Sequence, residues 1–233
     1  MRDGLLDQVK SKAYWRMNFR PKSLPEPQLS LPQCNDIVDR SKVSLRGWNY
    51  PHISSRKADD SGYGPIDSYY EHWIAWSEHI EFWRMYRTSQ FLHYRAVRED
   101  WEDWESYPPA SRPPEGGLSV VGIIWHWTEV FEFAFRLYKN GLYESGLELH
   151  LSLENAKGRQ LWINEFNRMP FSYERVTGAT SIRYEIALGS DDLASASHEV
   201  YLDELVDFFQ HFDWTPNKDM LRKDQNRLLT RSY

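Results

Sequence analysis

The chain has 233 residues, and its single cysteine, Cys34, excludes an internal disulfide and any cysteine-rich zinc module. This cysteine usage fits a reducing compartment. The first 21 residues are too charged for a secretory signal, and the most apolar stretch carries ionisable side chains, which disfavours a membrane span. We therefore expect a cytoplasmic protein that does not enter a membrane.

The charge is distributed unevenly along the chain. The net charge is −6, but residues 1–57 carry 11 Lys and Arg against 5 Asp and Glu, which leaves 17 against 29 in the remainder. Such polarity can serve binding to a nucleic acid or an acidic partner. It can equally let the N-terminal segment pack on the acidic remainder of the same chain.

The segment from Leu118 to Asn140 is the most apolar and the most clearly helical part of the sequence. Its polar residues recur every three or four positions and form one narrow stripe along a helix, while apolar residues cover the wider arc. We therefore predict a helix that is buried on most of its circumference. Asn140 and Gly141 can adopt the left-handed conformations that end a helix, so the predicted end lies there.

The segments before this helix are harder to assign. We predict a short helix over Asp7–Asn18, an extended proline-rich arm over about 20–33, and a helix that restarts near Leu31. The segment Ser44–Ile53 indicates a strand or a turn. In 68–97, part of the spacing is helical and part alternates as in strands; aromatic enrichment favours a hairpin in the second half, and extended structure is preferred for the first.

The segments after the central helix follow clearer patterns. Four leucines alternate with polar residues between Leu147 and Glu154, which predicts a strand with one buried face. A turn at 155–158 then predicts that Arg159–Ile163 returns as its partner. We expect another strand over 182–188 and two C-terminal helices, over Leu202–Phe212 and 216–229.

These elements together predict an α+β fold, in which antiparallel strands pack on a largely buried central helix and two helices follow at the C-terminus. We expect one domain over 1–233, with the arm at about 20–33 and an internal proline-rich linker at about 107–117. Edge strands rich in aromatic residues are compatible with a homodimer.

No motif with a committed chemistry is present. The spacing of His126 and Glu129 can place an imidazole and a carboxylate on one metal, but the sequence marks no further ligand. Cys34 could act as a nucleophile, although a lone cysteine is more often a small apolar residue. We predict no catalytic residue, no metal ligand and no cofactor, and the sequence favours a protein without enzymatic activity.

Aromatic residues make up 15% of the chain and include 11 tryptophans, a composition that suits recognition surfaces as well as cores. The sequence favours a non-catalytic binding or sensing module that recognises a protein partner or a small ligand. The predicted contact residues are Arg46, Trp48, Tyr50, His52, Trp83, Arg84 and Tyr86. The alternative is a nucleic-acid-binding accessory protein that uses the basic N-terminal third; a metal-dependent enzyme is the third hypothesis.

Overall fold

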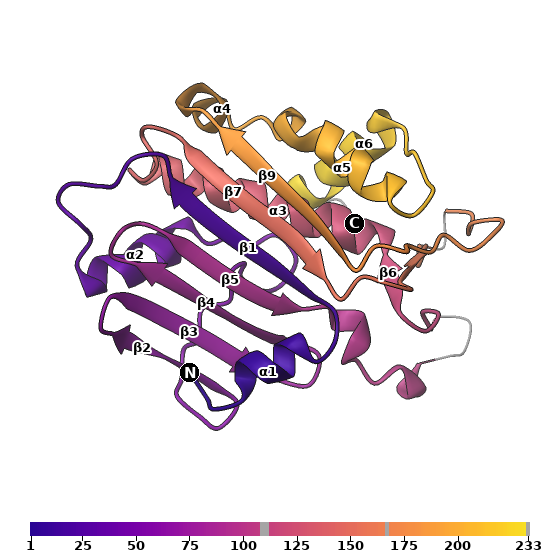
Figure 1. Ribbon diagram of the computed structural model, residues 1–233, viewed down its shortest axis with the longest axis horizontal. Coiled ribbons are helices and arrows are strands. Elements are labelled where there is room, and N and C mark those ends of the chain that lie inside the picture. Colours follow the sequence, from indigo (N-terminus) through magenta and orange to yellow (C-terminus); the bar gives the residue numbers. More distant parts are fainter. Residues whose placement is uncertain (108–111, 166–167, 232–233) are drawn as a thin grey trace.

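A computed structural model of the protein describes residues 1–107, 112–165 and 168–231. Its centre is a seven-stranded sheet with strand order β2-β3-β4-β5-β1-β7-β9, in which every neighbouring pair is antiparallel (Figure 1). The predicted α+β fold is confirmed. The strands of this sheet are β1 (Tyr14–Pro21), β2 (Ser61–Ile66), β3 (Tyr69–Ala75), β4 (Ile80–Tyr86), β5 (Phe91–Ala96), β7 (Leu147–Glu154) and β9 (Ser181–Leu188).

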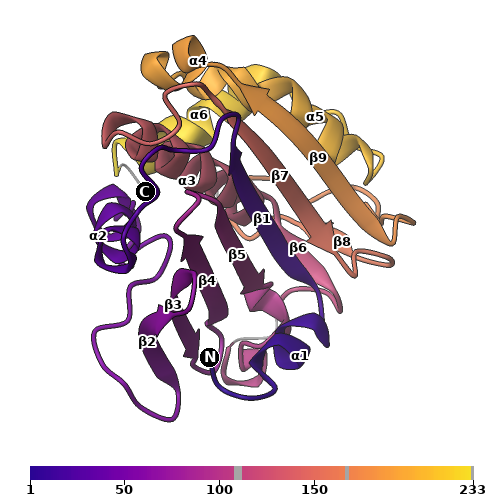
Figure 2. The ribbon, with the colours of Figure 1, turned by 60° about the vertical axis from the view of Figure 1, so that its left-hand side comes forward.

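Helices cover both faces of the sheet, but unequally. The long helix α3 lies against one face with α5 and α6 packed beside it, and the short helix α1 lies on the opposite face (Figures 1 and 2). The helices are α1 (Leu5–Lys10), α2 (Leu31–Ser41), α3 (Val120–Lys139), α4 (Ser190–Ser195), α5 (Leu202–Gln210) and α6 (Lys218–Leu229).

Helix α3 is the centre of the core, as predicted. Fourteen of its 20 residues are buried, and the Phe133 ring packs against Phe91 from the sheet at 4.9 Å between centroids. The Ser119 hydroxyl caps the helix by accepting a hydrogen bond from the amide of Gly122 at 3.0 Å. The helix ends at Asn140, and Gly141 follows with φ 93°, a conformation that glycine adopts without strain.

The predicted helix over Asp7–Asn18 is wrong beyond Lys10. From Tyr14 the chain is the central strand β1, whose Trp15 and Met17 side chains are buried towards α3. The alternation of large apolar residues, which has a period of two, overrides the helical propensity of the preceding turn. The prediction of a restart near Leu31 is confirmed, since α2 begins there.

The ambiguous segment 68–97 is extended throughout and forms β3, β4 and β5, so the helical spacing of its tryptophans was misleading. The predicted hairpin in its second half is confirmed as the β4–β5 pair. The segment Ser44–Ile53 is an irregular loop that is closed by a single antiparallel bridge between Val43 and Tyr50.

The predicted pairing of Arg159–Ile163 with the strand before it is wrong. Strand β7 instead pairs with β1 and β9, which lie on its two sides. The returning segment forms β8 (Gln160–Trp162) and pairs in parallel with β6 (Gly117–Ser119), directly before α3. Part of the predicted linker at 107–117, residues 108–111, lies outside the described residues.

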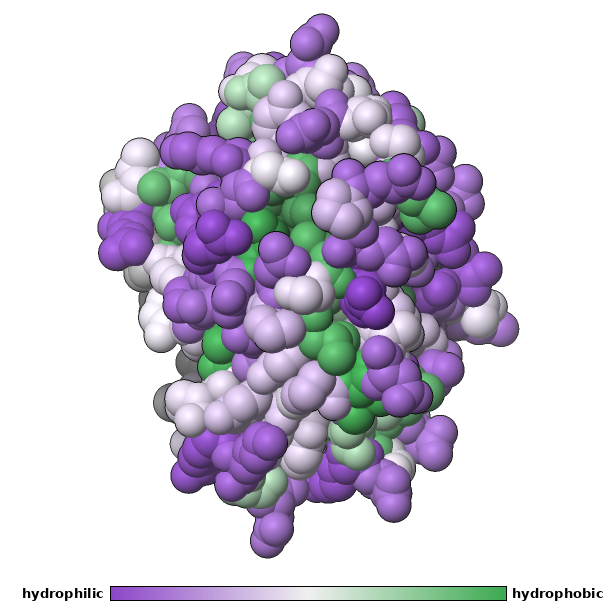
Figure 3. Space-filling model, turned by 90° about the vertical axis from the view of Figure 1, so that its left-hand side faces the viewer, coloured by the Kyte–Doolittle hydropathy of each residue, from purple (hydrophilic) through white to green (hydrophobic). Residues whose placement is uncertain are grey.

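The surface on the side of α2 and the edge strand β2 is mainly hydrophilic, and apolar residues show there only in narrow strips between polar ones (Figure 3). Within the described ranges, no helix combines the length and the apolar character that crossing a membrane requires. The single-domain organisation and the homodimer stay predictions.

Candidate functional site

A cavity of about 180 Å³ opens where three segments meet: the start of α3, the chain that follows β5, and the irregular loop 44–53. Four tryptophans in its wall are each partly buried, so that they belong neither wholly to the core nor to the free surface. They are Trp48, Trp104, Trp125 and Trp162. Large aromatic rings that remain partly exposed around a cavity are typical of a ligand-binding site.

The tryptophan rings are held in place by their own polar atoms. The Trp104 indole N–H donates to the carbonyl of Glu99 at 2.9 Å, and the Trp125 indole N–H donates to the carbonyl of Asp224 in α6 at 3.1 Å. Trp104 also packs edge-on against Trp162, with centroids 5.8 Å apart. The aromatic wall is therefore preorganised.

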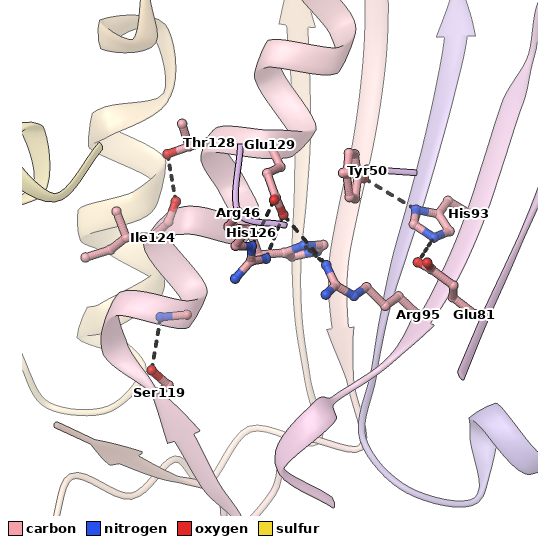
Figure 4. A network of polar contacts seen from close by, with 11 residues as sticks. Arg46, Tyr50, Glu81, His93, Arg95, Ser119, Ile124, His126, Thr128 and Glu129 are labelled. Carbon is pink, nitrogen blue, oxygen red and sulfur yellow. Dashed lines mark hydrogen bonds and ion pairs between the residues drawn. The ribbon is translucent and has the colours of Figure 1, made fainter. Parts of the chain in front are cut away.

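Beneath the aromatic wall lies a buried ion pair. The Arg46 guanidinium binds the fully buried Glu129 carboxylate with two hydrogen bonds, from Nε at 2.9 Å and from Nη2 at 2.6 Å (Figure 4). The same guanidinium lies over Trp48 and Trp125, at 5.4 and 5.9 Å from their ring centres. Bidentate contacts and aromatic stacking fix the plane of Arg46.

A second arginine, Arg95 of β5, reaches the same carboxylate. Its Nη1 lies 3.8 Å from Glu129 Oε2 and donates a hydrogen bond to His126 Nδ1 at 3.2 Å. Two cations therefore share one buried carboxylate. Figure 4 shows Arg46 and Arg95 converging on Glu129 with the His126 ring beside them.

This contact defines the protonation of His126. A guanidinium can only donate, so Nδ1 must accept and the proton of the neutral ring is on Nε2. Burial lowers the pKa of His126 well below its usual value, and the Arg95 and Arg46 cations lower it further. Within the described part of the chain, the buried Nε2–H has no hydrogen-bond partner.

The segment after β5 adds acidic groups to the cavity wall. The Glu99 carboxylate accepts the backbone N–H of Ser119 at 3.0 Å, and burial raises its pKa. Glu102 accepts a hydrogen bond from Arg98 at 2.8 Å. Glu99, in contrast, forms no ion pair with any described residue.

The structure brings together two of the seven predicted contact residues, Arg46 and Trp48, in the cavity wall. Tyr50 is fully buried beside them, with its hydroxyl 3.4 Å from His93 Nδ1. Trp83 is also buried in the core and donates to the carbonyl of His52 at 2.7 Å.

The remaining two predicted residues, Arg84 and Tyr86, lie on the opposite face of the sheet. There, the Arg84 guanidinium stacks on Tyr69 at 4.6 Å and pairs with Glu71 at 3.2 Å. The seven residues therefore do not form one surface. Their roles as contacts stay predictions.

The basic N-terminal third is likewise divided. Arg46 enters the cavity, whereas Arg16 lies over Tyr94 on the opposite face of the sheet. The Arg46–Glu129 ion pair is one contact between the basic N-terminal segment and the acidic remainder of the same chain. Nucleic-acid binding stays a prediction.

The residues that sequence reasoning missed are those that only the fold brings together. Arg95, Glu99 and the three tryptophans beyond Trp48 come from separate elements. The polar stripe of the central helix was a usable signal, since His126 and Gly122 line the cavity.

The spacing of His126 and Glu129 suggested a metal pair. In the structure, arginines occupy the Nδ1 lone pair of His126 and both oxygens of Glu129. Within the part of the chain that the structure describes, no three His, Cys, Asp or Glu side chains are grouped to hold a metal. The positions at which a metal would bind this pair are therefore taken by arginines, and the metal-dependent enzyme stays a prediction.

No protein-family model, curated protein or solved structure matches this chain. The chemistry of the cavity is therefore the basis on which a function can be assigned.

Proposed function

We propose that this protein is a non-catalytic binding module that holds a small ligand in the tryptophan-lined cavity at the start of α3. The observation that carries the proposal is the wall itself, in which four partly buried tryptophans line one cavity together with Arg46 and Arg95. Aromatic rings supply contact area at a low entropic cost, and a few converging polar groups supply specificity.

The size of the cavity limits the ligand. An engineered apolar cavity of about 150 Å³ is large enough to bind benzene. A cavity of about 180 Å³ therefore suits one compact molecule or one compact group of a larger one. Its lining differs from such an apolar cavity, because charged side chains form part of the wall.

His126 adds an unsatisfied polar group to the residues beside the cavity. Buried polar groups are nearly always hydrogen-bonded, because an unsatisfied one costs about 1–3 kcal/mol. The Nε2–H of His126 is such a group and belongs to a residue of the cavity wall. The nitrogen itself is buried, so an acceptor on a bound molecule reaches it only if side chains of the wall move.

A thermal-shift screen of the full chain against small compounds tests the proposal. The compounds have up to about 12 non-hydrogen atoms, and each such atom can contribute at most about 1.5 kcal/mol of binding free energy. We expect stabilising compounds whose effect is lost in Trp48→Ala. The matched control is Trp76→Ala, because Trp76 is 39% exposed and lies outside the cavity wall. Stabilisation that persists in Trp48→Ala, or no stabilisation by any compound, contradicts the proposal.

A further inference from the structure

The cavity wall carries opposite charges in different places. At the basic end, Arg46 and Arg95 share the single carboxylate of Glu129. Glu81 faces Arg95 across the β4–β5 pair, but its carboxylate already accepts a hydrogen bond from His93 at 2.8 Å. The basic end therefore has guanidinium groups that are only partly compensated.

The acidic end lies at the start of α3. Arg98 and Glu102 neutralise each other there, which leaves Glu99 as the carboxylate without an ion pair among the described residues. Its Oε1 accepts the Ser119 amide and lies 3.8 Å from the position that a Cβ on Gly122 would take. The lack of a side chain at Gly122 keeps this end open.

Helix α3 sets the distance between the two ends. Glu99 lies beside Gly122, whereas Arg95 contacts His126, four residues further along the same helix face. Four residues of α-helix correspond to a rise of about 6 Å. The two ends are therefore separated by roughly one helical turn, a distance that one compact molecule can bridge.

Resting on the binding function above, we infer that the ligand is a small zwitterion. Its ammonium group lies between the tryptophan rings against Glu99, and its carboxylate faces Arg95 and Arg46. Tryptophan faces attract ammonium groups through their ring quadrupoles. A guanidinium binds a carboxylate through charge-assisted hydrogen bonds.

A ligand with a single charge fits less well. An anion would meet the Glu99 carboxylate, and a cation would meet the arginines, so that each would leave one partly buried charge without a partner. A zwitterion compensates both ends at once. α-Amino acids and betaines are the two chemical sources of such a molecule.

Isothermal titration calorimetry of the full chain with four probes tests the inference. Glycine betaine and L-valine are a methylated and an unmethylated zwitterion; 3,3-dimethylbutanoate has the shape of glycine betaine without its positive charge, and choline lacks the carboxylate. We expect at least one zwitterion to bind about tenfold or more tightly than either single-charge probe, as expected for one charge-assisted hydrogen bond. Equal binding of a single-charge probe, or no binding of either zwitterion, overturns the inference.

Three variants locate the charges. In Glu99→Gln, the zwitterion is expected to lose its higher affinity relative to 3,3-dimethylbutanoate. In Arg95→Gln, it is expected to lose its higher affinity relative to choline. The matched control is Glu105→Gln, an exposed acid of the same segment outside the cavity wall, which leaves the affinity unchanged. Because Glu99 forms no ion pair with the described residues, Glu99→Gln carries the test if Arg95→Gln does not fold, and an unchanged preference in Glu99→Gln overturns the inference.

The outcomes separate this inference from the binding function on which it rests. If the compound screen yields a ligand that depends on Trp48 while neither zwitterion binds, the zwitterion is excluded and the binding function stands. If no compound of the screen and none of the four probes binds, both are excluded.

Discussion

Two buried histidines on the core side of the sheet differ in how far their hydrogen bonds are satisfied. His72 of β3 is 2% exposed; its Nδ1 accepts the Ser54 amide at 3.0 Å, and its Nε2 lies 2.9 Å from Asn35 Oδ1. His126 of α3 is 3% exposed, but among the residues that the structure describes only its Nδ1 has a hydrogen-bond partner, Arg95. Both rings are neutral and equally buried, so burial alone does not distinguish them.

The difference lies in what surrounds each ring. His72 is enclosed between the faces of Tyr63 and Trp83, with centroids 5.1 and 4.5 Å away. His126 instead belongs to the wall of a cavity. His72 is enclosed and has partners at both ring nitrogens, whereas His126 lies beside a cavity and has a partner among the described residues at one nitrogen only, so we expect His72 to contribute more to the stability of the fold. Four predictions test this distinction, in order of decreasing effect.

The largest loss of stability is expected for Glu129→Gln, which changes the carboxylate that Arg46 and Arg95 share. Removing the shared carboxylate charge leaves Arg46 partly buried without its counter-ion and leaves Arg95 with Glu81 alone as a neighbouring carboxylate among the described residues, which costs about 3–5 kcal/mol of unfolding free energy. Urea denaturation measures this loss. The control is Asp203→Ala, which removes an exposed ion pair with Lys218 and should produce no measurable change. A loss below about 1 kcal/mol for Glu129→Gln would show that the buried pair is not needed.

The second effect compares the two rings directly by His72→Phe and His126→Phe. The first change leaves the buried Ser54 amide without an acceptor and should cost about 1–3 kcal/mol. The second change removes the hydrogen bond from Arg95 and also removes the Nε2–H donor, which has no partner among the described residues. We therefore expect His126→Phe to lose less unfolding free energy, as measured by urea denaturation. If His126→Phe is the more damaging of the two, the distinction is wrong.

The third effect is the pH dependence that His72 introduces. Burial lowers the pKa of His72 to about 3, and the nearby His52 adds to the shift, while the usual value of 6.5 applies to the unfolded chain. The folded state thus binds fewer protons, so its stability is complete above pH 6.5 and falls as the pH drops towards 3, by at most about 1.4 kcal/mol per pH unit. Urea midpoints measured between pH 7 and 5 should decrease more steeply in the native protein than in His72→Phe.

The control for this pH series is His211→Phe, because the His211 side chain is 42% exposed on the surface. Its slope should match that of the native protein. Equal slopes for the native protein and His72→Phe would show that His72 does not titrate as its environment implies.

The contrast between local and non-local information explains what the sequence could predict. Helix α3, its end near Asn140 and its buried character follow from one continuous pattern, and so does the alternation in β7. The pairing of β8 does not, because a short segment after a turn can bond either to the preceding strand or, as here, to β6. The helix predicted over 7–18 failed because the pattern changes from helix to strand within a few residues.

The same contrast applies to the cavity. Arg46 and Trp48 were predicted as contacts of an aromatic and arginine-rich surface, and the polar stripe on α3 contained His126. The meeting of Arg95 with Glu129 could not be predicted, since it depends on which side of β5 faces α3. A difference of one residue in strand register would have placed Arg95 on the opposite face of the sheet.

The smallest effect is expected for alanine at Gly122, in the open region. Glycine inside a helix costs about 1 kcal/mol relative to alanine, but the new Cβ would lie only 3.0 Å from that of Ser119, so the two terms nearly cancel and stability should change by less than about 1 kcal/mol. The methyl group would nevertheless narrow the cavity beside Glu99 and weaken the binding of a ligand there. On the opposite face of the sheet, the Cβ of Gly62→Ala would lie 2.7 Å from the indole nitrogen of Trp73, which must move, so this variant should lose stability. Urea denaturation measures the stability of both variants, and calorimetric titration measures ligand binding by Gly122→Ala. If Gly122→Ala is strongly destabilised, or if it binds its ligand as well as the native protein does, the start of α3 is as closed as the surroundings of His72.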